Sequence, residues 1–370
     1  MKVILYIGHH KVGSTALQVF LTRNWARLAR LGILYPSTDH RGYAHNMRQL
    51  LERPPLKVLP AHIREPHNAL AYRMIADVSR REIPSQFGDL PSSRDMLERM
   101  QHQVAALMPH TVILCAEAFA NFGEVSPELI SQLCDSFSGA DFTLYCALRR
   151  PDDYLASWHG QRIKVGELVP PLRNGGLRQY LRTIHFNYRT VVEPWVQRVP
   201  QAQVLLRNYK DVVTAGGSVE DFTACCQLSL PEDLIPPGRS NPSLPLAAFA
   251  LMERANTELA PLPRHNLSLF LQAHAPALSP VANRDVEVFG AAQRAELLEA
   301  FRPHEAYLAG QTGQPQFFAD LEEIARPRPV PDQDAARQLL DAIDPESIPH
   351  PIPRAFIRAL KGSFSPCLQT

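Results

Sequence analysis

The first thirty residues contain the pattern that most restricts the fold: an apolar run, a glycine-bearing turn and an amphipathic helix. Val3–Ile7 is a β-branched run that stops at Gly8, which predicts a buried strand. From Ser14 onward the apolar period becomes helical. The stripe consists of Leu17, Leu21, Trp25 and Leu28. Strand, glycine turn and helix in this order predict the phosphate-binding start of an α/β sheet.

Three further apolar runs predict strands, and helical stretches lie between them. The runs are TVILCAE at 111–117, Phe142–Leu148 and Val204–Arg207. Strands that alternate with helices predict a parallel sheet covered on both faces. The helices expected between them start at Ser92 or Ser93, run near Pro127–Phe137, follow Pro151, and span about Leu177–Arg198. Residues 53–91 contain several prolines, so we expect loops with short helices there.

Strand patterns fade from about Pro231, and helices such as Pro245–Asn256 and Ala291–Ala309 take their place. Residues 326–354 are rich in Pro, Arg and Asp, which predicts an irregular surface segment. We therefore expect a single domain over residues 1–370. Its α/β core, a P-loop-like parallel sheet flanked by helices, covers about 1–230, and a mostly helical cap covers about 231–370.

Composition excludes several function classes. Lys plus Arg total 38 against 37 for Asp plus Glu, so nothing in the net charge of +1 favours nucleic acid or an anionic membrane as a partner. The six cysteines form no CxxC pair, so no metal is expected. The apolar run at the N-terminus is too short for a signal peptide, and no stretch reaches membrane-spanning length. These features predict a cytoplasmic protein.

The turn after the first strand has the composition of a phosphate-binding loop. Gly8 and Gly13 let backbone amides crowd around phosphate oxygens, and Ser14 and Thr15 begin the helix. A Walker loop needs lysine directly after the second glycine, where this chain has Ser14. The lysine here is Lys11, two residues before Gly13, which places the positive charge in the turn itself.

The segment HKVGST resembles the 5′-phosphosulfate loop of sulfotransferases that use 3′-phosphoadenosine 5′-phosphosulfate (PAPS), in particular the bacterial and carbohydrate-type branch. Val12 replaces the commoner threonine of that loop. The resemblance implies PAPS as donor and adenosine 3′,5′-bisphosphate (PAP) as product. The residues it assigns to the donor's 5′ end are His10, Lys11, Val12, Gly13, Ser14 and Thr15.

A second anion motif follows the run Phe142–Leu148. Arg149 and Ser157 are eight residues apart, with Pro151 able to begin a helix between them. An arginine at a strand tip and a serine in the following helix can converge on one anion. Sulfotransferases hold the 3′-phosphate of PAPS with an Arg and a Ser at this spacing, so the resemblance assigns that role to Arg149 and Ser157.

Sulfuryl transfer requires stabilisation of the leaving phosphate and a base for the acceptor's proton. The resemblance gives the first role to Lys11, which Ser157 would restrain until the acceptor arrives. Glu117 is our candidate base, because it follows a buried strand and AEAF resembles the SEXF stretch of the bacterial branch. Its pKa would have to be raised by burial. His45 is the second candidate base, and His159 is a candidate for lining the acceptor pocket.

Two alternatives stay open from the residues alone. One is a nucleoside-triphosphate-dependent kinase or GTPase of related fold, which Ser14 at the Walker lysine position disfavours. The other is a non-catalytic module that binds PAP or PAPS. The acceptor is expected to be a small-molecule or carbohydrate hydroxyl or amine, with specificity in residues 35–90 and 160–176. RSNPSL at 239–244 also resembles a loop of the bacterial branch, and no pattern indicates the oligomeric state.

Overall fold

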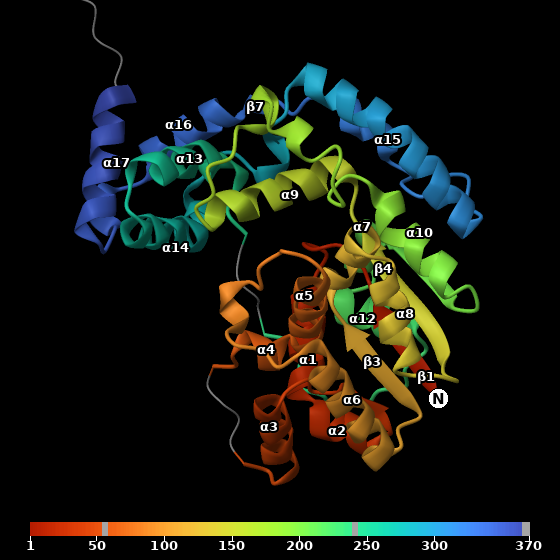
Figure 1. The fold of residues 1–370 in the computed structure, drawn as a ribbon. Helices are drawn as coiled ribbons and strands as arrows, with labels where there is room; N and C mark the ends of the chain where they lie inside the picture. The colour runs from red at the N-terminus through yellow and green to blue at the C-terminus, as the bar shows by residue number, and fades with distance from the viewer. Residues whose placement is uncertain (54–57, 239–242, 365–370) are drawn as a thin grey trace, which may run out of the picture. The chain divides into compact units, whose positions relative to one another are not determined.

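The computed structural model describes residues 1–53, 58–238 and 243–364 (Figure 1). The chain divides into two compact units, each built from three separate segments. The first unit contains Met1–Arg150, Asn187–Ser240 and His304–Phe317, and the second contains Pro151–Phe186, Asn241–Pro303 and Phe318–Thr370. These units do not coincide with the predicted division near residue 230, because each unit contains segments from both sides of that residue. Most of the RSNPSL segment, residues 239–242, lies outside the described residues.

The first unit is built on a five-stranded parallel sheet in the order β2-β3-β1-β4-β5. The central strand β1 pairs with β3 on one side and β4 on the other, so that Tyr6 lies opposite both Cys115 and Tyr145. The strands are β1 (Lys2–Tyr6), β2 (Ile33–Leu34), β3 (Thr111–Cys115), β4 (Asp141–Leu148) and β5 (Gln203–Asn208). The predicted parallel α/β sheet is therefore confirmed.

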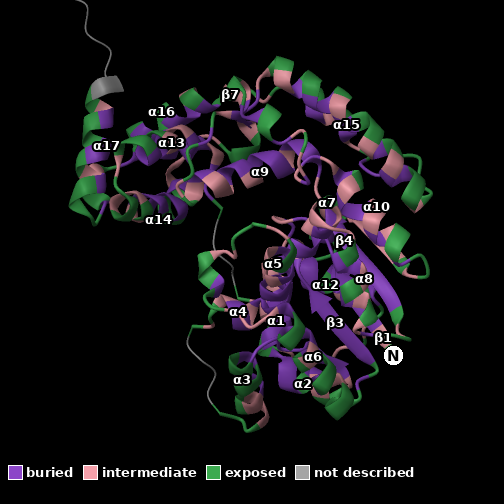
Figure 2. Cartoon of the chain, in the orientation of Figure 1, coloured by how far each residue is buried: buried purple, intermediate pink, exposed green. Residues whose placement is uncertain are grey.

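Strands β1 to β4 are largely buried and β5 is half-buried, whereas the helices carry both buried and exposed residues, as the mixed colours of the helices in Figure 2 show. All five residues of β3 are buried, because β-branched and aliphatic side chains leave no polar face. The longest helix of this unit, α6 (Ser93–Leu107), begins with Ser92 Oγ accepting a hydrogen bond from Asp95 N, as the sequence predicts.

The remaining helices of the first unit include several short ones. They are α1 (Ser14–Arg23), α2 (Trp25–Arg30), α3 (His40–Leu50), α4 (Ala61–Arg64), α5 (Pro66–Val78), α7 (Phe122–Val125), α8 (Glu128–Asp135), α10 (Tyr188–Arg198), α11 (Tyr209–Thr214) and α12 (Ser218–Cys225).

The second unit is mostly helical, as expected for the C-terminal part. Its helices are α9 (Pro151–Lys164), α13 (Phe249–Glu258), α14 (Pro261–Leu278), the part of α15 (Ala291–Thr312) up to Pro303, α16 (Asp332–Ala342) and α17 (Pro351–Phe364). Its strands in the described residues are the two-residue pair β6 (Val286–Glu287) and β7 (Val330–Pro331). Within the part of the chain that the structure covers, no helix combines the length and the apolar character needed to cross a membrane.

Three local predictions are wrong. Residues 326–354 are not an irregular surface segment, because α16 lies there and buries Ala335, Ala336, Leu339 and Leu340. The long helix expected over 177–198 is a short 3₁₀ turn at Leu177–Gln179 and then α10, whose first turn is capped by Asn187 Oδ1 accepting from Thr190 N. The region 53–91 contains the 13-residue, largely buried α5.

Candidate functional site

The strand order identifies one edge of the sheet as the place for a ligand. The chain leaves β1 toward β2 on one side, and it leaves β4 toward β5 on the other. Crevices of open α/β sheets form outside the carboxyl ends of strands whose connections diverge in this way. The loop Ile7–Gly13 starts at this point, and Arg149 directly follows β4.

Backbone contacts hold the start of this loop against β4. Ile7 N donates to Tyr145 O at 2.9 Å and His9 N donates to Ala147 O at 3.2 Å, which continues the β1–β4 pairing beyond β1. Gly8 lies between them, and a Cβ there would stand 2.7 Å from Ala147 N and 2.8 Å from Ala147 O. Only glycine permits this close approach of two backbones.

The second half of the loop turns into α1 through two left-handed residues. Lys11 has φ 61° and Gly13 has φ 85°, so the lysine lies within the turn as the sequence predicts. Ser218 Oγ donates to Gly13 O at 2.8 Å and so ties the turn to the start of α12. No side chain caps the first turn of α1 and no acidic residue lies in it. Such a helix start favours an anion.

The side chains of the loop point in different directions. Val12 is fully buried, so the methyl-bearing side chain that replaces threonine belongs to the core. Ser14 is also buried, whereas Lys11 and Thr15 are half-buried. The side chain of His10 extends toward the end of β3, where its Nδ1 lies 3.7 Å from Oε1 of Glu117.

Glu117 follows β3 and begins a 3₁₀ turn, Glu117–Asn121. Gln18 Nε2 of α1 donates to its Oε2 at 3.0 Å. Burial alone would raise the pKa of this carboxyl, but the interaction with His10 and further hydrogen bonds outweigh burial and lower the pKa to about 2. The pKa of Glu117 is therefore shifted in the direction opposite to the one that a base working near neutrality requires.

A second carboxylate beside Glu117 was not identified from the sequence. Glu65 is buried and accepts from Asn68 Nδ2 at 3.3 Å, while Asn68 Oδ1 accepts from Ala118 N at 3.1 Å. Burial and the nearby charge of Glu117 raise the pKa of Glu65, although its ion pair with Arg64 opposes them. Glu65 lies at the start of α5, in a segment that we expected to consist of loops with short helices, so no local pattern indicated this contact.

His45 lies elsewhere. It is a buried residue of α3, where Gln49 Nε2 donates both to its Nε2 at 3.1 Å and to Thr22 O at 2.8 Å. Burial and Arg48 lower the pKa of His45. Thr22 is eight residues after Ser14 in α1, about 12 Å along the helix. The structure thus joins His45 to the end of α1 that is remote from the loop.

Arg149 stands at the tip of β4 beside two tyrosines. Its guanidinium carbon lies 5.5 Å from the ring centre of Tyr209, and its carbonyl oxygen accepts from Tyr188 Oη at 2.5 Å. Among the residues described, no carboxylate forms an ion pair with Arg149. Ser157 and His159 lie on α9 of the second unit, so the convergence of Ser157 with Arg149 stays a prediction.

Helix α12 is the other feature that sequence reasoning missed. Asp221 on this helix is buried, accepts from Tyr145 Oη of β4 at 2.6 Å, and pairs with Arg207 of β5 at 2.7 Å. The sequence signal was Gly216–Gly217–Ser218, a glycine pair with positive φ before a helix. Its contact with Gly13 spans 205 residues of sequence.

Comparisons with known proteins assign no family. No model of a known protein family matches the chain, and no solved structure matches it. An uncharacterized protein of Archaeoglobus fulgidus is 27% identical over 117 residues, which is 31% of this chain and 31% of that protein. The match thus covers less than a third of the relative's length. Within the described residues, no three His, Cys, Asp or Glu side chains are grouped so that they could hold a metal ion.

Proposed function

We propose that the chain is a PAPS-dependent sulfotransferase of P-loop-like fold. The observation that carries this proposal is the occurrence of two cations after neighbouring strands, Lys11 in the loop that follows β1 and Arg149 directly after β4. A donor with a phosphosulfate at one end and a 3′-phosphate at the other needs two separate anion sites. A nucleoside triphosphate needs one continuous site with the Walker lysine, which Ser14 replaces.

The loop of the first unit fits the 5′-phosphosulfate. The glycine at position 13 and the uncapped first turn of α1 leave backbone amides for phosphate oxygens. Lys11, in the turn before them, would stabilise the charge that develops on the leaving phosphate. Arg149 has no competing carboxylate among the described residues, which suits a guanidinium that receives the 3′-phosphate, with Ser157 as the proposed second ligand.

Because the interaction with His10 lowers the pKa of Glu117, a movement of His10 on donor binding would change that pKa. Burial favours the protonated carboxyl, and the interaction with His10 holds it ionised. If His10 turns to the donor's phosphate, Glu117 loses this partner and burial then raises its proton affinity. Donor binding would thereby convert a structural carboxylate into a base for the acceptor hydroxyl or amine.

Titration calorimetry with PAP tests the donor site. We expect PAP to bind and ATP to bind at least about tenfold more weakly, because ATP lacks the 3′-phosphate. Lys11→Ala and Arg149→Ala should each weaken PAP at least about tenfold, since each removes a charge-assisted contact. Arg94→Ala, an exposed arginine of α6 paired with Glu98, is the matched control. Preference for ATP, or equal PAP affinity in all variants, would contradict the proposal.

A transfer assay separates enzyme from binding module. The low pKa of Glu117, which makes its carboxylate a weak base, is the observation that favours a module without turnover. Labelled sulfate from PAPS should appear in carbohydrate, phenol or amine acceptors when the protein is present and should disappear with Lys11→Ala. Tight PAP binding without transfer into any acceptor would support the non-catalytic alternative.

A further inference from the structure

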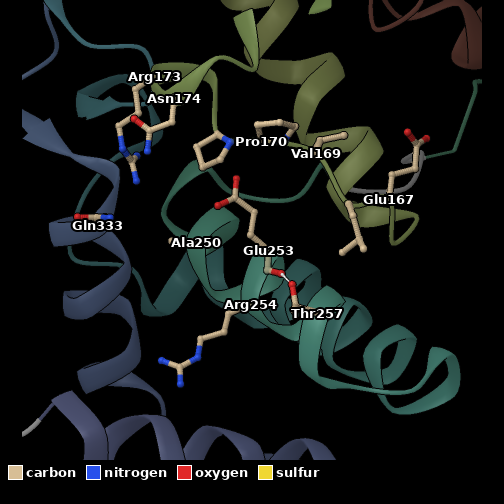
Figure 3. Close-up of a pocket in the computed structure, with 12 residues that line it drawn as sticks. Glu167, Val169, Pro170, Arg173, Asn174, Ala250, Glu253, Arg254, Thr257 and Gln333 are labelled. Atoms are coloured by element: carbon tan, nitrogen blue, oxygen red, sulfur yellow. Dashed lines mark hydrogen bonds between the residues drawn. The ribbon is translucent and has the colours of Figure 1, made fainter.

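The second unit contains a cavity of about 590 Å³, well within the size range of small-molecule sites. One wall is the loop after α9, with Val169, Pro170 and Pro171, and the opposite wall is α13, with Glu253 and Thr257 (Figure 3). All the residues that line it belong to the second unit. The cavity is therefore formed within a single unit of the chain.

The charged groups around the cavity are balanced except for one. Glu167 pairs with Arg162 at 2.7 Å and Arg254 pairs with Glu258 at 2.6 Å. Arg173 pairs with Asp332. Glu253 is the exception: within the described residues no lysine or arginine pairs with it, although only 19% of its side chain is exposed. Its ion-pair partner among the described residues is the imidazole of His159, so no permanently charged side chain neutralises this carboxylate.

The surroundings of Glu253 leave its carboxylate available to a ligand. Figure 3 shows the carboxylate directed toward the loop beside Pro170, while Arg254 points away from it. Behind it, His159 is 1% exposed and contacts Tyr180 Oη through Nδ1 at 2.9 Å. Nε2 of His159 faces Glu253 Oε1 at 3.7 Å, which is too long for a hydrogen bond. A half-buried carboxylate without a hydrogen-bonded partner favours an incoming cation.

The other groups of the cavity define the kind of cation. The side chains of Asn174 and Gln333 also line the cavity, and their amide oxygens are acceptors that a ligand with N–H donors can use. Val169, Pro170, Pro171 and Ala250 offer apolar surface to the rest of the molecule. We propose that this cavity binds a small primary amine through Glu253, with its aliphatic or aromatic body against the loop Val169–Pro171.

Calorimetry with hexylamine, 1-hexanol and hexanoate at neutral pH tests the site on the full-length protein. The three probes share one chain and differ in the charge of the head group. We expect hexylammonium to bind with saturation and at least about tenfold more tightly than hexanol, because of the charge-assisted contact with Glu253, and hexanoate not to bind. Equal binding of hexylammonium and hexanol would overturn the proposal.

Two variants and a control locate the binding. Glu253→Gln keeps the shape and removes the charge, so hexylammonium affinity should fall at least about tenfold while hexanol is unaffected. Ala250→Leu fills the cavity and should weaken both probes, which provides a test even if the first variant folds poorly. Glu299→Gln removes an exposed carboxylate of α15 and should change nothing. Unchanged hexylammonium affinity in folded Glu253→Gln or Ala250→Leu would refute the site.

Discussion

Glu117 shows how two opposing influences on one carboxyl set its charge. Burial raises its pKa and the interaction with His10 lowers it, and the second prevails. The same residue also accepts from Gln18, so the first turns of α1 are linked to the end of β3 just after the loop Ile7–Gly13. The charge of this group is therefore a property of the loop as well as of the strand.

The lowered pKa of Glu117 predicts a loss of stability in acid. Its folded-state pKa of about 2 lies below the ordinary 4.5 of the unfolded chain. The stabilisation is thus fully present above pH 4.5 and is lost as the pH falls through 2. We expect Glu117→Gln to reduce the fall in unfolding free energy between about pH 5 and 3 by about 2 kcal/mol, as measured by urea denaturation.

Two further variants check the cause. His10→Ala should raise the pKa of Glu117, observed by ¹³C NMR titration of the carboxyl carbon, because burial then acts without its main opponent. Glu98→Gln, an exposed carboxylate of α6, should leave the acid dependence unaltered. If the unfolding free energies of Glu117→Gln and of the unaltered protein fall equally between about pH 5 and 3, the lowering of the Glu117 pKa by His10 is refuted.

The buried carboxylate of Asp221 connects helix α12 to two strands of the sheet. Asp221 binds Tyr145 of β4 and Arg207 of β5, and the helix in turn supports Gly13 through Ser218. We expect Asp221→Asn to lower the free energy of unfolding by about 2 kcal/mol, since it leaves the partly buried Arg207 without its counter-charge. Urea denaturation at pH 7 measures this change.

The matched control is an ion pair of the same type at the surface. Glu193 pairs with Arg189 at 2.7 Å on α10, and Glu193→Gln should cost less than about 1 kcal/mol because solvent screens the pair. Equal losses in the two variants would show that the Asp221 cluster contributes no more than a surface pair.

Elements with a uniform local pattern were predictable, and those decided by distant packing were not. The apolar runs that became β1, β3, β4 and β5 each identify a strand within one or two residues. Helix α16 was missed because the prolines on both sides dominated the pattern, although its Ala–Ala and Leu–Leu pairs have helical spacing. The contacts of Ser218 with Gly13 and of Asn68 with Ala118 join segments far apart in sequence, which no local pattern encodes.

At the scale of the whole molecule, the compact units are not continuous pieces of chain. The first unit needs His304–Phe317, where Tyr307 lies with its ring centre 5.3 Å from the guanidinium of Arg189. The second needs Pro151–Phe186, where Ile163 O accepts from Asn256 Nδ2 at 2.9 Å. A sequence-based boundary near residue 230 could not reveal that the segments of the two units alternate along the chain, because this depends on which distant segments pack together.

Fragments cut at that boundary should therefore not fold independently. We expect residues 1–230 and residues 231–370, expressed separately, to lack a cooperative urea transition and a native near-UV circular dichroism spectrum. Coexpression of the two fragments should restore both signals, because every segment of each unit is then present. A cooperative transition in the separate fragment 1–230 would contradict this division of the chain.

The backbone at Lys11 has a consequence for protein engineering. An L-residue with φ 61° costs about 1–2 kcal/mol, and glycine avoids this penalty while adding about 1 kcal/mol of entropy to the unfolded chain. The backbone conformation alone therefore gives lysine and glycine at position 11 nearly equal stability. Any preference for lysine at this position must therefore come from what its side chain contacts, within the protein or in a bound ligand.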